Sequence, residues 1–179
     1  MTLENRCLDV FPGWLRTLGD DARLLAAVLE NPACSEASRR RSAAALTYLF
    51  KSLDLVPDGL EDLGFIDDAF VFRVSLTDVS EEDVAADSTG TLGRLKQDAE
   101  LIREFLGELY ERLERYVTTL QSGSARGRSV DEVLADESKR EELTREARQW
   151  ADGYQAPTLT RDEKNLIKLR SFLAAKLPA

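Results

Sequence analysis

The strongest constraint on the fold is a stripe of apolar side chains that recurs alternately every three and every four residues. Its nine positions are Leu92, Leu95, Ala99, Ile102, Leu106, Leu109, Leu113, Tyr116 and Leu120. This spacing places all nine on one face of an α-helix, so it predicts a single helix over residues 91–120, about 44 Å long. Because such a face must be covered, the stripe predicts a protein built from packed helices.

The seam from Leu92 to Leu120 leaves two interpretations open. A strict heptad stripe is typical of a coiled coil between two chains, which predicts a homo-oligomer or another protein partner. Phe105, Tyr110 and Val117 widen the stripe on its flanks, however. A wide stripe suits packing against several helices of the same chain, and this second interpretation is favoured.

The rest of the chain reads as shorter helices separated by turn signals, with seven to nine helices in all. We expect helices over about residues 9–18, 20–31, 36–53, 67–76, 81–90, 129–134, 136–151 and 160–177. Most of these begin at a serine, threonine or aspartate that can cap backbone N–H groups. No segment reads as a strand, and residues 121–128 read as a polar connection.

We therefore expect one all-α domain over residues 1–179, a compact multi-helix bundle with one long central helix at about 91–120. Its C-terminal part, about residues 129–177, is expected to form a helical extension. The chain has the apolar and charged content of a globular protein, at 43% and 32%.

The absence of histidine excludes several classes of mechanism at once. Serine–histidine and cysteine–histidine nucleophilic pairs and imidazole zinc sites all need that side chain. Glycine motifs that bind nucleotides or dinucleotides are missing as well, so no organic cofactor is expected. Any catalysis would have to use carboxylates, lysines, tyrosines or a hard metal ion.

The net charge of −9 makes nucleic acid a poor partner, because both halves of the chain are acidic. No apolar run is long enough to span a membrane, and the first residues do not resemble a secretory signal. Cys7 and Cys34 belong to no CxxC pair and are expected to be free thiols. Together these features predict an acidic, cytoplasmic protein.

Between Tyr48 and Asp68 an apolar helix is followed by an Asp-Leu-x-Pro-Asp break, a glycine and an Asp-Asp pair. The residues that carry this order are Tyr48, Leu49, Asp54, Leu55, Val56, Pro57, Asp58, Leu63, Gly64, Asp67 and Asp68. The stretch resembles the YkvA family, a largely bacterial set of uncharacterised proteins, over about Tyr48–Leu76. The resemblance implies a helix–loop–helix element at about residues 43–76 and no particular activity.

Many members of that family look membrane-associated, but this chain departs from them in the element itself. Lys51 and Ser52 stand where Ser-Pro is usual, and Glu61 stands where a second proline is usual. The flanking helices are also more polar than in the family. These departures do not favour a membrane location.

Four aspartates, Asp54, Asp58, Asp67 and Asp68, form the one constellation with potential chemistry. If the loop folds back, their carboxylates would converge and repel one another unless a cation lay between them. Oxygen ligands of this kind suit Mg²⁺, Mn²⁺ or Ca²⁺. The competing interpretation is that they cap helices and complement helix dipoles, and it is the one that the sequence favours.

No catalytic residue can be assigned from these observations. The sequence favours a non-enzymatic helical interaction or scaffold protein whose partner would bind through the Leu92–Leu120 seam. The alternative is a metal-dependent hydrolase that uses the four aspartates around Mg²⁺, Mn²⁺ or Ca²⁺. A weaker alternative is a peripheral membrane-associated protein.

Overall fold

The computed structural model describes all 179 residues, and its first helix, α1, runs unbroken from Leu3 to Glu30. The prediction of two helices separated at Gly19 was therefore wrong. Gly19 stays helical because it lies against another helix, where a Cβ would be 3.4 Å from the carbonyl oxygen of Ala151. Pro12 also lies inside α1, where it removes one backbone donor without ending the helix.

Eight further helices and one small hairpin follow, which confirms the predicted all-α class. They are α2 (Glu36–Leu49), α3 (Ile66–Ser75), α4 (Glu81–Ala86), α5 (Thr91–Leu106), α6 (Leu109–Leu120), β1 (Ser124–Ala125), β2 (Arg128–Ser129), α7 (Val130–Ala135), α8 (Glu137–Gly153) and α9 (Glu163–Lys176). The expected serine caps of α2, α4 and α7 are present, whereas α9 is capped by Asp162 and not by Thr160. No helix combines the length and the apolar content that crossing a lipid bilayer requires.

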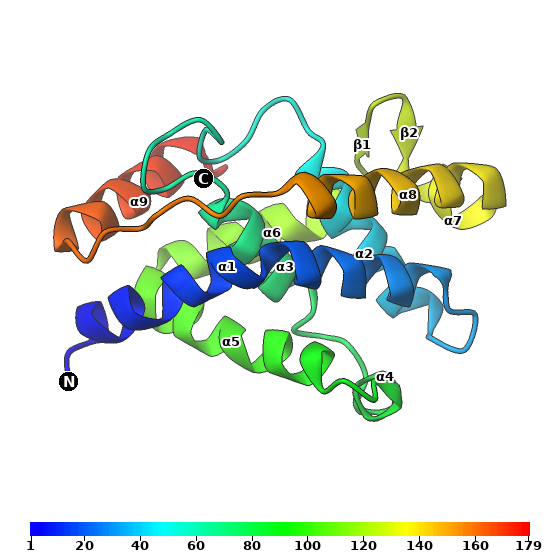
Figure 1. Ribbon diagram of the computed structural model, residues 1–179, viewed down its shortest axis with the longest axis horizontal. Coiled ribbons are helices and arrows are strands. Elements are labelled where there is room, and N and C mark those ends of the chain that lie inside the picture. The colour runs from blue at the N-terminus through cyan, green and yellow to red at the C-terminus, as the bar shows by residue number, and fades with distance from the viewer.

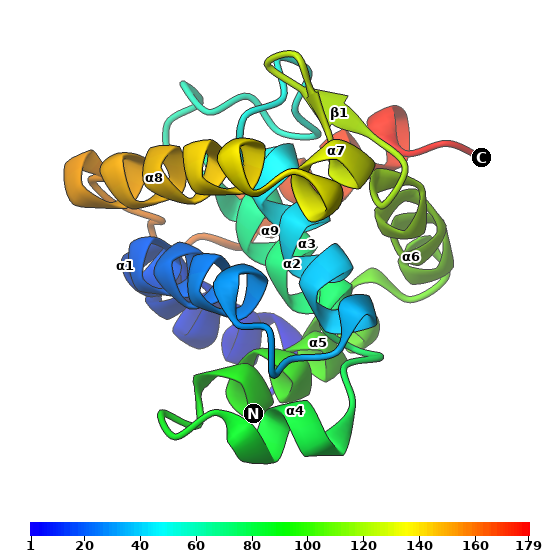
Figure 2. The same cartoon turned by 90° about the vertical axis from the view of Figure 1, so that its right-hand side faces the viewer.

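Helix α3 lies at the centre of the bundle, and all ten of its residues are buried. It packs against α1, α2, α5 and α6, and Figure 2 shows it enclosed by these helices with α8 above them. The Phe70 ring meets the rings of Phe11 and Trp14 edge-on, with centroids 5.2 and 6.0 Å apart. Because α3 is covered on every side, its polar side chains must find partners inside the protein.

The predicted long helix over 91–120 is divided into α5 and α6, so that prediction was wrong in its length. The break lies at Gly107, whose φ of +56° and ψ of −125° are open to glycine and strained for other residues. The apolar spacing continues across the break because Leu106 and Leu109 are still three residues apart. The sequence pattern therefore could not reveal where the helix axis bends.

The seam itself faces the interior of the same chain. Of its nine positions, seven are buried and two, Leu109 and Tyr116, are half-buried. Leu95, Ile102 and Leu113 are fully enclosed and belong to the same apolar cluster as the α1 and α3 side chains. This arrangement agrees with packing inside one chain, which the sequence favoured over a seam shared by two chains.

Residues 121–128, expected to be a plain connection, form most of a hairpin that ends at Ser129. Strands β1 and β2 pair antiparallel through Ser124 with Ser129 and Ala125 with Arg128. The two turn residues, Arg126 and Gly127, both have positive φ, which suits the right-handed twist of a two-residue hairpin. Beyond α8, an extended segment runs back along α1 to reach α9 (Figure 1).

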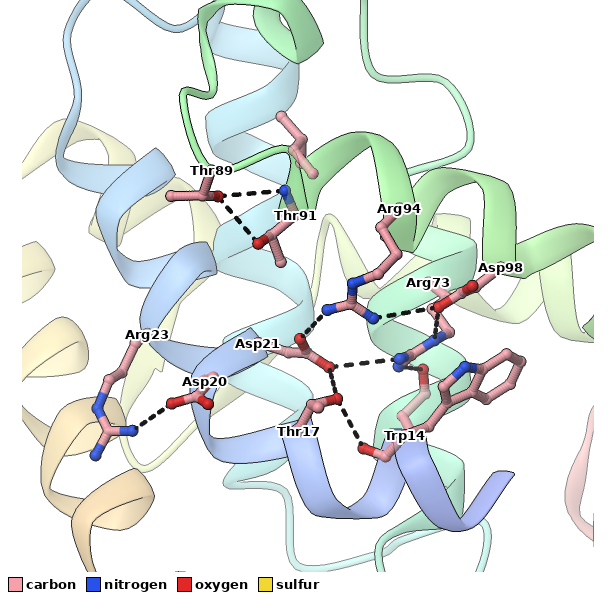
Figure 3. A network of polar contacts seen from close by, with 12 residues as sticks. Trp14, Thr17, Asp20, Asp21, Arg23, Arg73, Thr89, Thr91, Arg94 and Asp98 are labelled. Atoms are coloured by element: carbon pink, nitrogen blue, oxygen red, sulfur yellow. Dashed lines mark hydrogen bonds and ion pairs between the residues drawn. The ribbon is translucent and has the colours of Figure 1, made fainter. Parts of the chain in front are cut away.

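A buried charge network joins α1, α3 and α5 (Figure 3). The Arg73 guanidinium donates to Asp98 at 3.0 Å and to the Ala69 carbonyl at 3.1 Å, and pairs with Asp21 at 3.5 Å. Arg94 donates to the other oxygen of Asp21 at 2.9 Å and closes the network. Two guanidinium groups thus meet two carboxylates, so the network is neutral overall.

The Arg73 side chain is completely enclosed, with its guanidinium carbon 4.2 Å from the ring centroid of Trp14. Burial lowers the pKa of Arg73 and raises the pKa of its equally buried partner Asp21, because the interior disfavours both charges. Each charge therefore depends on the other. The network fixes the C-terminal half of α3 against its neighbours.

We predict that Arg73→Met lowers the free energy of unfolding by about 3–5 kcal/mol, because it leaves Asp21 as a buried carboxylate with one fewer partner. Urea unfolding followed by circular dichroism measures the change. The matched control is Arg23→Met, which removes a guanidinium from two exposed pairs, with Asp20 and Asp152, and should cost less than about 1 kcal/mol. Equal losses for both variants would contradict this assignment.

Candidate metal centre

The loop between α2 and α3 determines how the aspartates are placed. Helix α2 ends at Leu49, four residues earlier than the sequence predicted, and Leu53 is left 83% exposed. Two non-glycine residues of the loop, Asp62 and Phe65, adopt left-handed φ values of 70° and 67°. Such conformations cost energy and are maintained only where the surrounding structure imposes them.

Gly64 allows the loop to fold back on itself. Its backbone N–H donates to the carbonyl of Leu60 at 3.0 Å. A Cβ on Gly64 would lie 2.3 Å from the carbonyl oxygen of Asp58, which is a severe clash with the main chain. Only glycine therefore fits here. The close backbone contact places Asp58 near the start of α3.

Asp67, in the first turn of α3, holds the other end of the loop. Its Oδ2 accepts a hydrogen bond of 2.5 Å from the Tyr48 hydroxyl and one of 3.2 Å from the Val56 N–H. The Tyr48 oxygen accepts in turn from the Leu55 N–H at 2.9 Å. No group of the protein donates to the second oxygen, Oδ1, although Asp67 is fully buried.

Asp68 is the least satisfied side chain of the group. It is 1% exposed, and neither of its carboxylate oxygens receives a hydrogen bond from the protein. Asp58, Asp67 and Asp68 each offer one oxygen, and these three oxygens all lie within 4.8 Å of one another. We refer to these three residues as the aspartate triad.

The structure brings together three of the four predicted site residues. Asp54 lies outside the triad, but its charge is close enough to raise the pKa of Asp58, Asp67 and Asp68. The capping interpretation was wrong for α3, because Phe65 occupies the N-cap position and no side chain caps the helix. Its first turn still favours negative charge through the helix dipole.

Burial is the largest cause of the raised carboxyl pKa values in the triad. It raises the pKa of Asp58 to about 7 and that of Asp67 to about 6, and it raises the pKa of Asp68 well above the usual range. Repulsion between the neighbouring carboxylates raises the pKa of Asp58 and Asp68 further. None of the ion pairs in the protein includes a triad residue: Arg73, at the other end of α3, pairs with Asp21 and Asp98.

Two tyrosines, Tyr48 and Tyr116, border the triad, and the sequence pattern did not identify them as part of the site. Burial and the Asp67 carboxylate raise the pKa of Tyr48, so its hydroxyl stays a hydrogen-bond donor. Tyr116 packs against Tyr48 with ring centroids 6.2 Å apart, and burial, followed by the nearby aspartates, raises its pKa as well. The one available signal was the position of Tyr48, a polar-tipped side chain just before an acidic break.

The outer side of the loop is supported by two aromatic rings, one in the last turn of α8 and one just after it. The Phe65 ring lies 5.7 Å from that of Trp150 and 5.4 Å from that of Tyr154. The Tyr154 hydroxyl donates to the Leu15 carbonyl of α1 at 2.8 Å. Trp150 and Tyr154 are therefore packing residues, as the sequence favoured, and they hold the residue that precedes α3.

Chemically, the triad is a set of hard oxygen ligands without a positive partner. Two of its carboxylates are buried and one is exposed, so a cation would reach it from the side of Asp58. Mg²⁺, Mn²⁺ and Ca²⁺ bind ligands of this kind, whereas sites for softer metals use sulfur or imidazole. The buried oxygens that no protein group satisfies fit such an ion.

Comparison with known proteins leads to the same part of the chain. A family described as "Protein of unknown function (DUF1232)" matches residues 41–73. The matched segment runs from α2 to Arg73 and contains Tyr48, Gly64 and the complete triad. No curated protein and no solved structure matches the chain. The molecule is thus an all-α bundle whose central element is similar to an uncharacterised family.

We predict that the metal-free protein loses stability as the pH rises from about 5 to about 8. Groups with raised pKa values hold their protons in the folded state and lose them on unfolding, so their stabilising effect disappears as the pH passes the folded pKa. The relevant values are about 6 for Asp67 and about 7 for Asp58. Histidine, which would otherwise titrate in this range, is absent.

The measurement is the urea midpoint as a function of pH, with a chelator present throughout. The Asp58→Asn variant should show a smaller decrease than the unaltered protein, because one of the titrating carboxyls has been removed. A midpoint that stays constant or increases over this range would contradict the pKa directions.

Proposed function

We propose that this protein binds a hard divalent cation, Mg²⁺, Mn²⁺ or Ca²⁺, at the aspartate triad. The observation that carries the proposal is Asp68, a buried carboxylate with no hydrogen-bond donor on either oxygen. Burial keeps such a carboxyl protonated unless a positive charge compensates it, and a cation among three carboxylates would supply that charge. The oxygen of Asp67 that is free of Tyr48 and Val56 is available to the same ion.

The cation would also explain why the loop has a strained backbone. Asp58 belongs to the loop and Asp67 and Asp68 belong to α3, so one ion bound by all three joins the loop to the helix. The left-handed Asp62 and Phe65 lie between these two attachment points. We infer that this YkvA-like element is a cation-stabilised helix–loop–helix in a cytoplasmic protein.

The preference for a scaffold protein with a partner on the Leu92–Leu120 seam loses its basis, because most of the seam is covered by other helices of the same chain. A partner could reach the seven buried positions of the seam only if the bundle opened. The aspartate triad, in contrast, is formed in the folded protein. Cation binding is therefore the function that the geometry supports best.

We predict that millimolar Mg²⁺, Mn²⁺ or Ca²⁺ raises the melting temperature at neutral pH. At a cation concentration of one hundred times Kd, mass action adds about 2.7 kcal/mol. For a chain of this size each kcal/mol corresponds to a rise of about 2–4 °C. Differential scanning fluorimetry measures the shift, and calorimetric titration gives the stoichiometry.

The Asp68→Asn variant should lose this response while folding at least as well without metal, because it removes a buried carboxyl group that has no partner in the protein. The matched control is Asp62→Asn in the same loop, which makes the same change of charge and keeps a residue type that tolerates a left-handed backbone. A melting temperature that no divalent cation changes would rule out the proposal. So would an equal loss of response in both variants.

A second candidate function, hydrolysis of phosphate esters, is favoured by the exposure of Asp58. An ion bound at the edge of the triad keeps water ligands on the solvent side, and a bound metal lowers the pKa of such water. We expect Mn²⁺-dependent hydrolysis of bis(p-nitrophenyl) phosphate, followed by the absorbance of p-nitrophenolate, and its loss in Asp58→Asn. Cation binding without any hydrolysis would leave the ion with a structural role only.

A further inference from the structure

A groove unrelated to the aspartate triad lies between α9, the first turn of α1 and the corner between α5 and α6. Its volume is about 590 Å³. The apolar side chains that line it are Leu3, Phe105, Leu109, Leu166, Ile167 and Ala174. The bend at Gly107 contributes to the groove because it turns α6 away from α5 just before Leu109. We refer to this surface as the α9 groove.

One face of helix α9 is buried in the bundle, and the face that lines the groove is left uncovered. Leu169 and Leu173 are buried in the bundle. Ile167, on the other face, is 66% exposed. The other exposed large apolar residues are Met1 at the terminus, Leu53 in a loop and the smaller Val10. Along this face Glu163, Ile167, Arg170 and Ala174 are separated by four, three and four residues, which is the spacing that a second helix packs against.

The charges around the α9 groove are mostly negative and unpaired. Glu4 and Glu163 lie on its rim, and neither takes part in an ion pair. The one basic residue, Arg170, is turned toward the floor, where it donates to the Phe105 carbonyl and lies 4.9 Å from the Phe105 ring centroid. The groove therefore combines an apolar floor with an acidic rim.

We propose that the α9 groove binds a basic amphipathic helix of a partner protein. The apolar floor would contact the apolar face of that helix, and Glu4 and Glu163 would pair with lysines or arginines on its flanks. A second copy of this chain is a poor occupant, because it carries the same net charge of −9 and the same two glutamates. The proposal is independent of the cation site.

The experiment follows the methyl groups of isoleucine by NMR, because the chain has three isoleucines in separate places. Ile167 reports on the α9 groove, Ile102 on the core and Ile66, next to Asp67, on the aspartate triad. The probe is a synthetic helical peptide of leucine and lysine, with leucine at every third and fourth position. A peptide of the same composition in scrambled order is the control.

We expect the amphipathic peptide to shift the Ile167 signal in a saturable way and to leave Ile66 and Ile102 unchanged. Ala174→Arg, which adds bulk and positive charge to an exposed wall of the groove, should weaken binding at least ~10-fold, about 1.4 kcal/mol. Ala175→Arg makes the same change at the next exposed residue, outside the groove, and should leave the affinity unchanged.

Equal shifts with the scrambled peptide, or equal effects of the two arginine variants, would overturn the proposal, because binding would then be nonspecific attraction to an acidic surface. A doubled mass of the free protein in light scattering, together with loss of the Ile167 response, would assign the groove to a second copy. A response to octyl glucoside and none to the peptide would assign it to an uncharged ligand. Addition of Mg²⁺ tests the aspartate triad separately through Ile66.

Discussion

The complete burial of α3 is the constraint on which the rest of the structure depends. A ten-residue helix enclosed on all sides would ordinarily be apolar, but this one carries two aspartates in its first turn and an arginine in its last. Each of these ionisable groups has left water, and each needs a partner within the protein. The bundle supplies partners at one end of the helix and leaves them incomplete at the other.

At the C-terminal end the solution is a neutral network. Arg73 meets Asp21 and Asp98 and lies over the Trp14 ring, so α1 and α5 are both joined to α3. At the N-terminal end Asp67 has Tyr48 and the Val56 N–H, but Asp68 has no donor. The contrast within one helix is what distinguishes an architectural network from a candidate ligand site.

The sequence was sufficient for those features that depend on residues close together in the chain. Periodic apolar positions predicted the helices, and serine caps placed the starts of α2, α4 and α7. The order of aspartates around Pro57 and Gly64 identified the element that also matches a family of unknown function. These signals are local, because a helix and its cap are specified within a few residues.

The features that the sequence did not predict depend on contacts between distant segments. Gly19 reads as a helix end, but its proximity to Ala151 of α8 keeps it inside α1. The apolar repeat passes through the bend at Gly107 without a change of spacing. The sequence favoured helix capping for the aspartates. It could not show that Asp58 lies close to α3, because that position depends on a backbone contact with Gly64 that no side-chain pattern records.

The two tryptophans of the chain occupy corresponding positions at opposite ends of α3. Trp14 stacks on Arg73 at one end, and Trp150 contacts the Phe65 ring just before the other. Indole emission depends on nearby charge and solvent, so the protein carries an intrinsic optical probe at each end of its central helix. Replacing one tryptophan at a time by phenylalanine would separate the two signals. Changes in charge or solvent exposure at either end of α3 could then be followed without any attached dye.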